Sequence, residues 1–304
     1  MSEKNPPPGM VSRVCGVVVT YHPDITALTQ LLELIVPQVE TLVIVDNGSD
    51  TDLVAIAEKF NVKLQLLGEN FGIARAQNVG IKLAGDLGAN QVLLLDQDSL
   101  PAPDMVEKLT AAAQILLDQG KTVAAVGANY VDPRQGDTGS FVYREGLVLK
   151  RRPMKTPNSI VEADFLIASG SLTSIEVFDQ VGDMVDELFI DYVDIEWGLR
   201  ARSMGYFSYG VFNAHMEHAL GDDHIPFRGH RVPLHGALRH YYQLRNAVWL
   251  ARRSWIPRVW TLLLVWRMFR QFLFFSVAAP KGLTHSRMMT AGILDGLRGR
   301  MGRK

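Results

Sequence analysis

Residues 92–98 read VLLLDQD and set the fold class expected of this chain. A short run of apolar residues is typical of a strand that is buried on both faces, and two carboxylates follow where the strand ends. In open parallel sheets, ligands bind beyond the carboxyl ends of the strands, because loops and helix N-termini meet there. The stretch therefore predicts an α/β fold with a polar crevice along one edge of the sheet.

Apolar runs of the same kind recur on both sides of this stretch, and segments with apolar residues at helical spacing separate them. The expected strands are residues 14–20, 42–45, 62–67, 92–95 and 123–126, and the expected helices are 25–36, 52–60, 73–85 and 103–119. This alternation predicts a doubly wound, mostly parallel sheet of Rossmann-like type.

The pattern changes after residue 130. Proline and glycine interrupt residues 130–159, so loops are expected there, with one hairpin around 141–149. Further elements are then expected as a strand at 160–167, a short helix near 175–180, a helix from about 191 to 204 and a strand at 207–212. The expected organisation is one domain over 1–250 and a basic, amphipathic helical tail over 251–304.

Charge and composition exclude several classes of protein. The 31 Lys and Arg residues balance the 32 Asp and Glu residues, so no overall field draws the chain to nucleic acid, and no such partner is expected. Cys15 is the single cysteine, which suits a reducing compartment. Residues 1–10 are polar and proline-rich, unlike a secretory signal. We therefore expect a cytoplasmic protein.

Polar residues follow the first four expected strands, at the edge where a ligand would bind. The turn 46–49 (DNGS) offers Asp46 to a base or ribose, although Asn-Gly is also an ordinary turn sequence. The loop 70–74 (NFGIA) enters a helix whose N–H groups suit phosphate, and an ordinary helix start explains it equally well.

Two carboxylates at positions i and i+2 form the sharpest feature. Asp96 and Asp98 repel one another unless a cation joins them, which indicates a divalent-ion site; alternatively, Asp98 caps the next helix. His218, after the strand expected at 207–212, is a candidate for a further ligand, and a solvated loop histidine is the alternative.

A second acidic cluster opens the last helix of the expected domain. Asp191 and Asp194 are three residues apart and share a helix face, whereas Glu196 is spaced to pair with Arg200. Negative charge at a helix N-terminus offers a purely structural explanation. We assign chemistry to Asp194 and structure to Glu196.

Taken together, these motifs resemble the family-2 inverting glycosyltransferases with the A-type nucleotide-sugar fold, and among them the rhamnosyltransferases of bacterial polysaccharide (O-antigen and rhamnan) assembly. The string 70–78 (NFGIARAQN) is similar to the family's N-x-G-x-A-x-A-x-N helix entry, and 242–246 (YQLRN) to its Y-x-x-R-N helix. The resemblance implies Asp194 as catalytic base and a Mg²⁺ or Mn²⁺ site at Asp98 and His218, assisted by Asp96. It implies donor contacts at Thr20, Tyr21, Asp46, Asn47, Asn70, Gly72, Asn78, Asp96 and Gln97, and acceptor-side residues Asp191, Glu196, Trp197 and Arg245.

The function implied by the resemblance is inverting transfer of one sugar, L-rhamnose from dTDP-β-L-rhamnose, to a lipid-linked or polysaccharide acceptor. The alternatives are a family-2 hexosyl- or galactofuranosyltransferase that uses a UDP-sugar, a nucleotidyltransferase, and a glycan-binding protein. Residues 20–23 (TYHP) lack the glycine-rich, basic loop of nucleotidyltransferases. Both acidic clusters are intact, which favours an enzyme over a binding protein.

The expected tail contains an apolar stretch at 259–279 with Arg267 and Arg270 inside it. Central arginines make a membrane span costly, so an interfacial helix on the inner face of the plasma membrane fits better. The tryptophans expected at the headgroup level are Trp255, Trp260 and Trp266. The alternative is a helix packed on the body or in a homo-oligomer interface.

Overall fold

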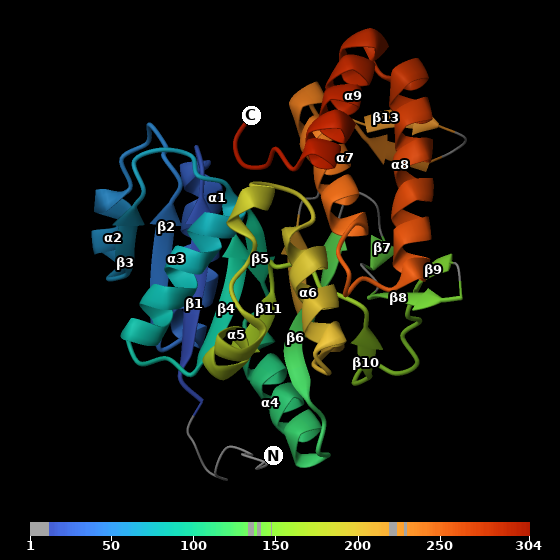
Figure 1. Ribbon diagram of the computed structural model, residues 1–304. Helices are drawn as coiled ribbons and strands as arrows, with labels where there is room; N and C mark the ends of the chain where they lie inside the picture. Colours follow the sequence, from blue (N-terminus) through green and yellow to red (C-terminus); the bar gives the residue numbers. More distant parts are fainter. Residues whose placement is uncertain (1–11, 133–136, 139–140, 147, 219–223, 228–229) are drawn as a thin grey trace.

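The computed structural model describes residues 12–132, 137–138, 141–146, 148–218, 224–227 and 230–304 (Figure 1). Its centre is a sheet with the strand order β10-β12-β6-β11-β4-β1-β2-β3. These strands are β1 (Val14–Thr20), β2 (Thr41–Asp46), β3 (Lys63–Leu66), β4 (Gln91–Asp96), β6 (Val123–Asp132), β10 (Ile160–Ala163), β11 (Ser171–Ser174) and β12 (Phe207–His218).

The neighbouring strands from β3 through β2 and β1 to β4 all run parallel, as the alternating pattern predicts. β1 pairs in parallel with β2 and β4, β2 with β3, and β12 with β6. β11 is antiparallel to both β4 and β6. The prediction of a mostly parallel, Rossmann-like sheet is confirmed, while β11 and the edge strand β10, which is antiparallel to β12, are reversals that the pattern does not reveal.

The two faces of the sheet carry separate hydrophobic cores. One face is covered by α1 (Ile25–Ile35), α2 (Val54–Phe60) and α4 (Met105–Asp118). The other is covered by α3 (Ile73–Asp86), α5 (Ile175–Val181) and α6 (Val193–Ser203), which lie in front of the sheet in Figure 1. Val18 of β1 belongs to the first core, and Val17 and Val19 belong to the second. Every residue of β1 is therefore buried.

Parallel pairing brings the ends of three strands level with one another. Thr20 at the end of β1 is in register with Asp46, and Val19 is in register with Asp96. The polar residues that follow these strands therefore gather at one edge of the sheet, as expected.

The last part of the chain forms a helical layer beside the sheet. It consists of α7 (Ala237–Ala251), α8 (Arg258–Ala278) and α9 (Gly282–Arg298), and α7 packs against both of the others. Leu199 of α6 and Tyr192, which precedes this helix, join the layer to the body, because both share a core with Trp260. The boundary expected at residue 250 falls at the end of α7, so the helical layer begins before it.

Small strands complete the second half. β8 (Val142–Glu145) and β9 (Val148–Arg151) form the expected hairpin, and β13 (His224–Phe227) pairs with β14 (His230–Pro233). β5 (Ser99–Pro101) pairs with β12, and β7 (Asp137–Thr138) with β6.

Several expected boundaries are wrong. The strand expected at 160–167 ends at Ala163, and the strand expected at 123–126 continues to Asp132, because its last residues pair with β12 and β7. β12 does not end at residue 212 but continues to His218, because its last residues pair with β5. α6 begins at Val193 instead of 191, because Asp191 and Tyr192 have φ values of 64° and 67°, outside the helical region.

Candidate active site

Asp46 organises the turn that follows β2. Its buried carboxylate accepts N–H bonds from Gly48 at 3.2 Å and Ser49 at 2.9 Å, and the Thr20 hydroxyl donates to it at 2.9 Å. Because Thr20 ends β1, one carboxylate ties the first two strand ends together. The predicted donor residues Thr20 and Asp46 thus lie side by side in the floor of the crevice.

Asn47 and Asn70 connect this turn to the loop before α3. The Asn47 amide donates to Asn70 Oδ1 at 3.1 Å, and Gly72 N donates to the same oxygen at 2.9 Å. Gly72 has φ +89°, and a Cβ there would lie 2.5 Å from the carbonyl oxygen of Phe189. Only glycine fits this approach, which joins the expected donor loop to the second acidic cluster.

Gln97 joins the ends of β1 and β4. Its Oε1 accepts from Tyr21 N at 2.8 Å, and its Nε2 donates to Tyr21 O at 3.3 Å. The Tyr21 side chain is 44% exposed and packs edge-on against His22. Tyr21 therefore presents an aromatic surface at the rim of the crevice.

The first acidic group stands directly at the end of β4. Asp96 is half-buried and Asp98 is exposed. The Asp96 N–H donates to the Ser169 hydroxyl at 3.0 Å, which in turn lies 2.6 Å from the Ser99 hydroxyl. Strand pairing sets the main chain of His218 opposite Ser99, next to Asp98.

The side chain of His218 lies outside the described residues. Within the described part of the chain, no group of three His, Cys, Asp or Glu side chains is placed to hold a metal ion. The carboxylates of Asp96 and Asp98 remain a donor set of the kind that Mg²⁺ and Mn²⁺ accept, since these ions take a few protein carboxylates and complete their shell with phosphate and water.

The second acidic group lies in residues 189–194, a strained loop that continues into the first turn of α6. We call this segment the acidic loop. Phe189, Asp191 and Tyr192 all have positive φ, between 64° and 67°. Such a conformation is unfavourable for residues with side chains and persists only where the surroundings hold it. The Phe189 carbonyl accepts from Ile73 N at 2.7 Å, so the start of α3 supports one end of the loop.

Buried residues of α7 hold the rest of the acidic loop. Asn246 Nδ2 lies 2.9, 2.8 and 2.9 Å from the carbonyl oxygens of Leu188, Ile190 and Asp191. Arg245 is 1% exposed, and its guanidinium donates to Leu188 O at 2.9 Å. The Y-x-x-R-N segment therefore has a structural role that the sequence did not reveal: it clamps the loop that carries the second acidic group.

Asp194 stands in the first turn of α6. Burial raises the pKa of Asp194 to about 6; the N–H of Ile195, at 2.8 Å, opposes the shift, and the charges of Asp191 and Asp96 add to it. Asp194 and Leu94 of β4 also line one small cavity. Leu94 lies on the strand that ends at Asp96, and the charge of Asp96 reaches Asp194, so the two acidic groups lie near one another although 98 positions separate them in the sequence.

Asp191 is held in place from α7. Arg239 Nε donates to its carboxylate at 3.1 Å, and Gln243 Nε2 lies 3.5 Å from it. The Asp191 side chain remains 15% exposed.

Four of the predicted site residues make contacts within the scaffold, and three of these are buried while Asn78 is half-buried. Glu196 accepts from Arg200 at 2.8 Å, as the spacing predicts, and Trp197 donates to Gly182 O at 2.9 Å. Asn78 donates to Met184 O at 2.8 Å. With Arg245, these side chains hold the segments that form the site, and Trp197 lines the same cavity as Asp194.

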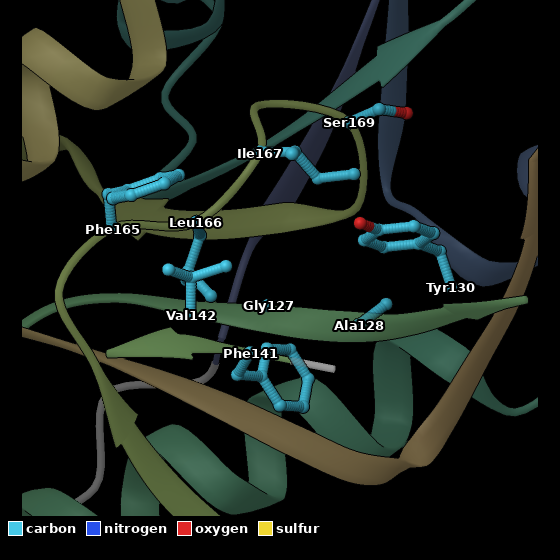
Figure 2. A pocket seen from close by; sticks show the side chains of 9 residues that line it. All are labelled: Gly127, Ala128, Tyr130, Phe141, Val142, Phe165, Leu166, Ile167 and Ser169. Atoms are coloured by element: carbon cyan, nitrogen blue, oxygen red, sulfur yellow. The ribbon is translucent and has the colours of Figure 1, made fainter. Parts of the chain in front are cut away.

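An apolar pocket lies beside the first acidic group, between β6 and the loop 165–169. Figure 2 shows Tyr130 and Ile167 pointing toward each other across it, with Ser169 at its rim. Ser169 also receives the Asp96 N–H, so the pocket borders the crevice. Sequence reasoning missed it because its walls come from separate segments: Gly127, Ala128, Tyr130, Phe141, Val142, Phe165, Leu166, Ile167 and Ser169.

Solved structures share this fold. GalNAc-T7, solved with UDP, GalNAc and Mn²⁺, has a TM-score of 0.62 at 13% identity, and the match covers 94% of this chain but 56% of that one. TarS 1-349 of S. aureus, solved with UDP-GlcNAc, has a TM-score of 0.59 at 16% identity, covering 94% of this chain and 81% of that one. At these identities the likeness establishes the A-type glycosyltransferase fold alone.

Sequence comparison gives the family. A dTDP-rhamnosyl transferase of Shigella flexneri, RfbF, is 30% identical over 298 residues, which is 95% of this chain and 97% of the relative. The model of glycosyl transferase family 2 matches residues 17–181, which contain the Asp96–Asp98 turn and the loop before α3. Together with the fold and with the shared site of the two acidic groups, these matches establish that the chain belongs to glycosyl transferase family 2.

Proposed function

We propose that this protein transfers L-rhamnose from dTDP-β-L-rhamnose to a lipid-linked or polysaccharide acceptor, with inversion at the anomeric carbon, in the assembly of a bacterial surface glycan. One observation carries the proposal: Asp194 lines one cavity with Leu94 of β4, the strand that ends at Asp96, and the charge of Asp96 acts on Asp194. A donor held at the first group would therefore face an acceptor at the second. The similarity to a dTDP-rhamnosyl transferase supports the choice of sugar.

The donor would lie along the strand ends. Tyr21 offers its exposed ring to the base, and the turn that Asp46 organises offers its edge to the ribose. Asp96 and Asp98 would hold a divalent cation with the donor diphosphate, and His218 is the proposed third ligand. When bound there, the cation supplies positive charge against the charge that develops on the leaving diphosphate.

Asp194 would act as the catalytic base. The acceptor hydroxyl oxygen forms a bond to the anomeric carbon from the face opposite the diphosphate, while the bond from that carbon to the diphosphate oxygen breaks. The hydroxyl proton passes to the Asp194 carboxylate. A carboxyl group with a pKa of about 6 is a stronger base than an ordinary aspartate and is still ionised at neutral pH.

Donor identity can be tested by binding and turnover together. Thermal-shift measurements would compare dTDP-rhamnose, UDP-galactose, UDP-glucose and UDP-galactofuranose in the presence of Mg²⁺ or Mn²⁺, and release of the nucleoside diphosphate would be followed with each donor. We expect the largest stabilisation and the fastest release with dTDP-rhamnose. A clear preference for a UDP-sugar would instead assign the protein to the hexosyl- or galactofuranosyltransferases of the same family.

We also propose that α8 lies on the cytoplasmic face of the membrane that carries the acceptor. In the described part of the chain, α8 is the one helix long and apolar enough to cross a membrane. Trp266 is 57% exposed, whereas Trp260 is buried and Trp255 is half-buried. Of the three tryptophans expected at the headgroup level, Trp266 is therefore the one that can contact lipid. The exposed apolar stripe of α8 is formed by Leu262, Val265, Trp266, Phe269, Leu273 and Val277.

Exposed arginines of the same helix, Arg258, Arg267 and Arg270, would suit anionic headgroups. Flotation with liposomes that contain anionic lipid tests this directly. Wild type should float with the vesicles, and a variant with Trp266→Ser and Phe269→Ser should remain in the load fraction. If the wild type does not float but forms a dimer that the same substitutions dissociate, the stripe is a homo-oligomer interface and the membrane proposal is wrong.

A further inference from the structure

Residues 299–304, which follow α9, contact the segment before the acidic loop, and we call them the strap. Gly302 N donates to Glu187 O at 2.8 Å, and Lys304 N donates to the Tyr242 hydroxyl at 2.8 Å. Figure 1 shows this segment passing from α9 toward the loops at the carboxyl edge of the sheet. No residue of the strap is among the site residues that the resemblance implies.

Buried groups fix the conformation of the strap. The guanidinium of Arg245 donates to Gly302 O as well as to the carbonyls of residues 187 and 188. Met301 packs against the core formed with α3 and α6. Lys304 places its ammonium 4.4 Å from the centre of the Tyr241 ring. The same buried arginine thus holds the strap and the segment that leads into the acidic loop.

The strap carries Arg303 to the loop before α3. Arg303 Nη1 lies 3.4 Å from the carbonyl oxygen of Asn70 and 3.5 Å from the carboxylate of Glu69. Both contacts are long and involve the same nitrogen, and the Arg303 side chain is 59% exposed. Most of the guanidinium is therefore accessible to a ligand, and an ion pair this exposed contributes little to stability.

The charges of the site indicate that a cation is needed to bind the donor. Asp96, Asp191 and Asp194 make the crevice acidic, whereas the donor diphosphate is itself an anion. Arg239 is already paired with Asp191. A guanidinium matches two phosphate oxygens with two parallel N–H bonds, so Arg303 can exchange its weak contact with Glu69 for a stronger one with the donor.

We infer that Arg303 is a donor-positioning residue, and that this one residue of the strap forms the wall of the donor site beside Asn70. The inference rests on the proposed function, because it requires a nucleoside diphosphate in that crevice. Glu69 then competes with the phosphate for the guanidinium. Substitutions at Arg303 and at Glu69 should consequently change donor affinity in opposite directions, which a merely structural ion pair would not do.

The test compares Arg303→Ala, Arg303→Lys and Glu69→Gln with Arg300→Ala, an exposed arginine of the same strap. The donor KM and kcat are measured, with calorimetric affinity for dTDP and UDP. Arg303→Ala should raise the donor KM and the Kd of the diphosphate about tenfold and change kcat less than about twofold. Arg303→Lys should recover part of the loss, Glu69→Gln should improve affinity, and Arg300→Ala should match wild type.

Thermal unfolding of all four variants should stay close to that of wild type, since the contacts are exposed. Equal donor KM and Kd for Arg303→Ala and Arg300→Ala would overturn the inference while leaving the proposed function intact. Loss of affinity in both Arg303→Ala and Glu69→Gln would make the pair structural and would also overturn it. A wild-type protein that binds neither diphosphate and transfers no sugar would refute the proposed function itself.

Discussion

The two acidic groups of the site reach the same crevice by different physical routes. Asp96 and Asp98 follow a buried parallel strand, and the regular register of β1, β2 and β4 alone brings them to the edge of the sheet. Asp191 and Asp194 sit in or after a loop with three left-handed residues, which needs the start of α3 and the buried side chains of α7 to hold it. Strand register positions the first group, whereas long-range contacts with α3 and α7 position the second.

The largest expected effect concerns the proton transfer at the second group. Asp194→Asn keeps the size of the side chain but removes the base, so kcat should fall about a thousandfold while the donor Kd changes little. Because the buried, ionised carboxylate carries a raised pKa, its removal should not lower the thermal stability. Steady-state kinetics, calorimetry and thermal unfolding measure the three quantities.

The control for this substitution is Glu196→Gln, two residues along the same helix. Glu196 is 1% exposed and paired with Arg200, so its substitution should reduce stability but preserve turnover per folded molecule. If Glu196→Gln abolished turnover and Asp194→Asn did not, the catalytic assignment within the acidic loop would be wrong.

The next largest effect tests the first group. Asp98→Asn should lower kcat/KM about a hundredfold at limiting Mg²⁺ or Mn²⁺, because a neutral amide is a poorer ligand for a hard cation. Excess cation should restore part of the rate, and excess chelator should abolish it in the wild type. Asp118→Asn, another exposed aspartate, serves as the control. A wild type that keeps full activity in chelator would remove the cation from the mechanism.

The sequence allowed the first half of the molecule to be predicted closely and the second half only in part. In β1, β2 and β4, apolar runs match buried strands, and the polar residues at their ends follow from chain direction alone. The strap could not be predicted, because nothing local in residues 299–304 indicates contact with Asn70. Likewise, no hydrophobic periodicity in residues 189–194 indicates that three of them have positive φ. Asn246, which holds this loop, lies more than fifty positions away in the sequence. Long-range main-chain contacts leave no local pattern.

A smaller effect probes this clamp. Asn246→Ala leaves three carbonyls without their amide donor in a buried position, so the free energy of unfolding should fall by about 2–4 kcal/mol. The loop should also lose its strained geometry, and kcat should fall more than the donor affinity. Asn213→Ala removes an exposed amide bond to Asn158 at 3.2 Å and should change stability by less than about 1 kcal/mol. Equal effects of the two substitutions in urea unfolding would contradict the clamp.

The smallest effect is a shift in pH dependence. A base must be ionised, so kcat/KM should rise with pH through the pKa of about 6 that burial gives Asp194. Asp191 adds a negative charge that raises this pKa, so Asp191→Asn should move the acidic limb of the pH profile to lower pH. An acidic limb at the ordinary aspartate pKa in the wild type would show that the group is not desolvated.

The central claim is that the two acidic groups, reached by these separate routes, serve one donor complex. Anomalous diffraction from crystals grown with Mn²⁺ and dTDP tests it most directly. We predict a manganese peak between the diphosphate and the carboxylates of Asp96 and Asp98, with Asp194 facing the position of the missing sugar. Well-ordered dTDP and manganese bound away from this crevice, or separated from Asp194 by the body of the protein, would contradict the account.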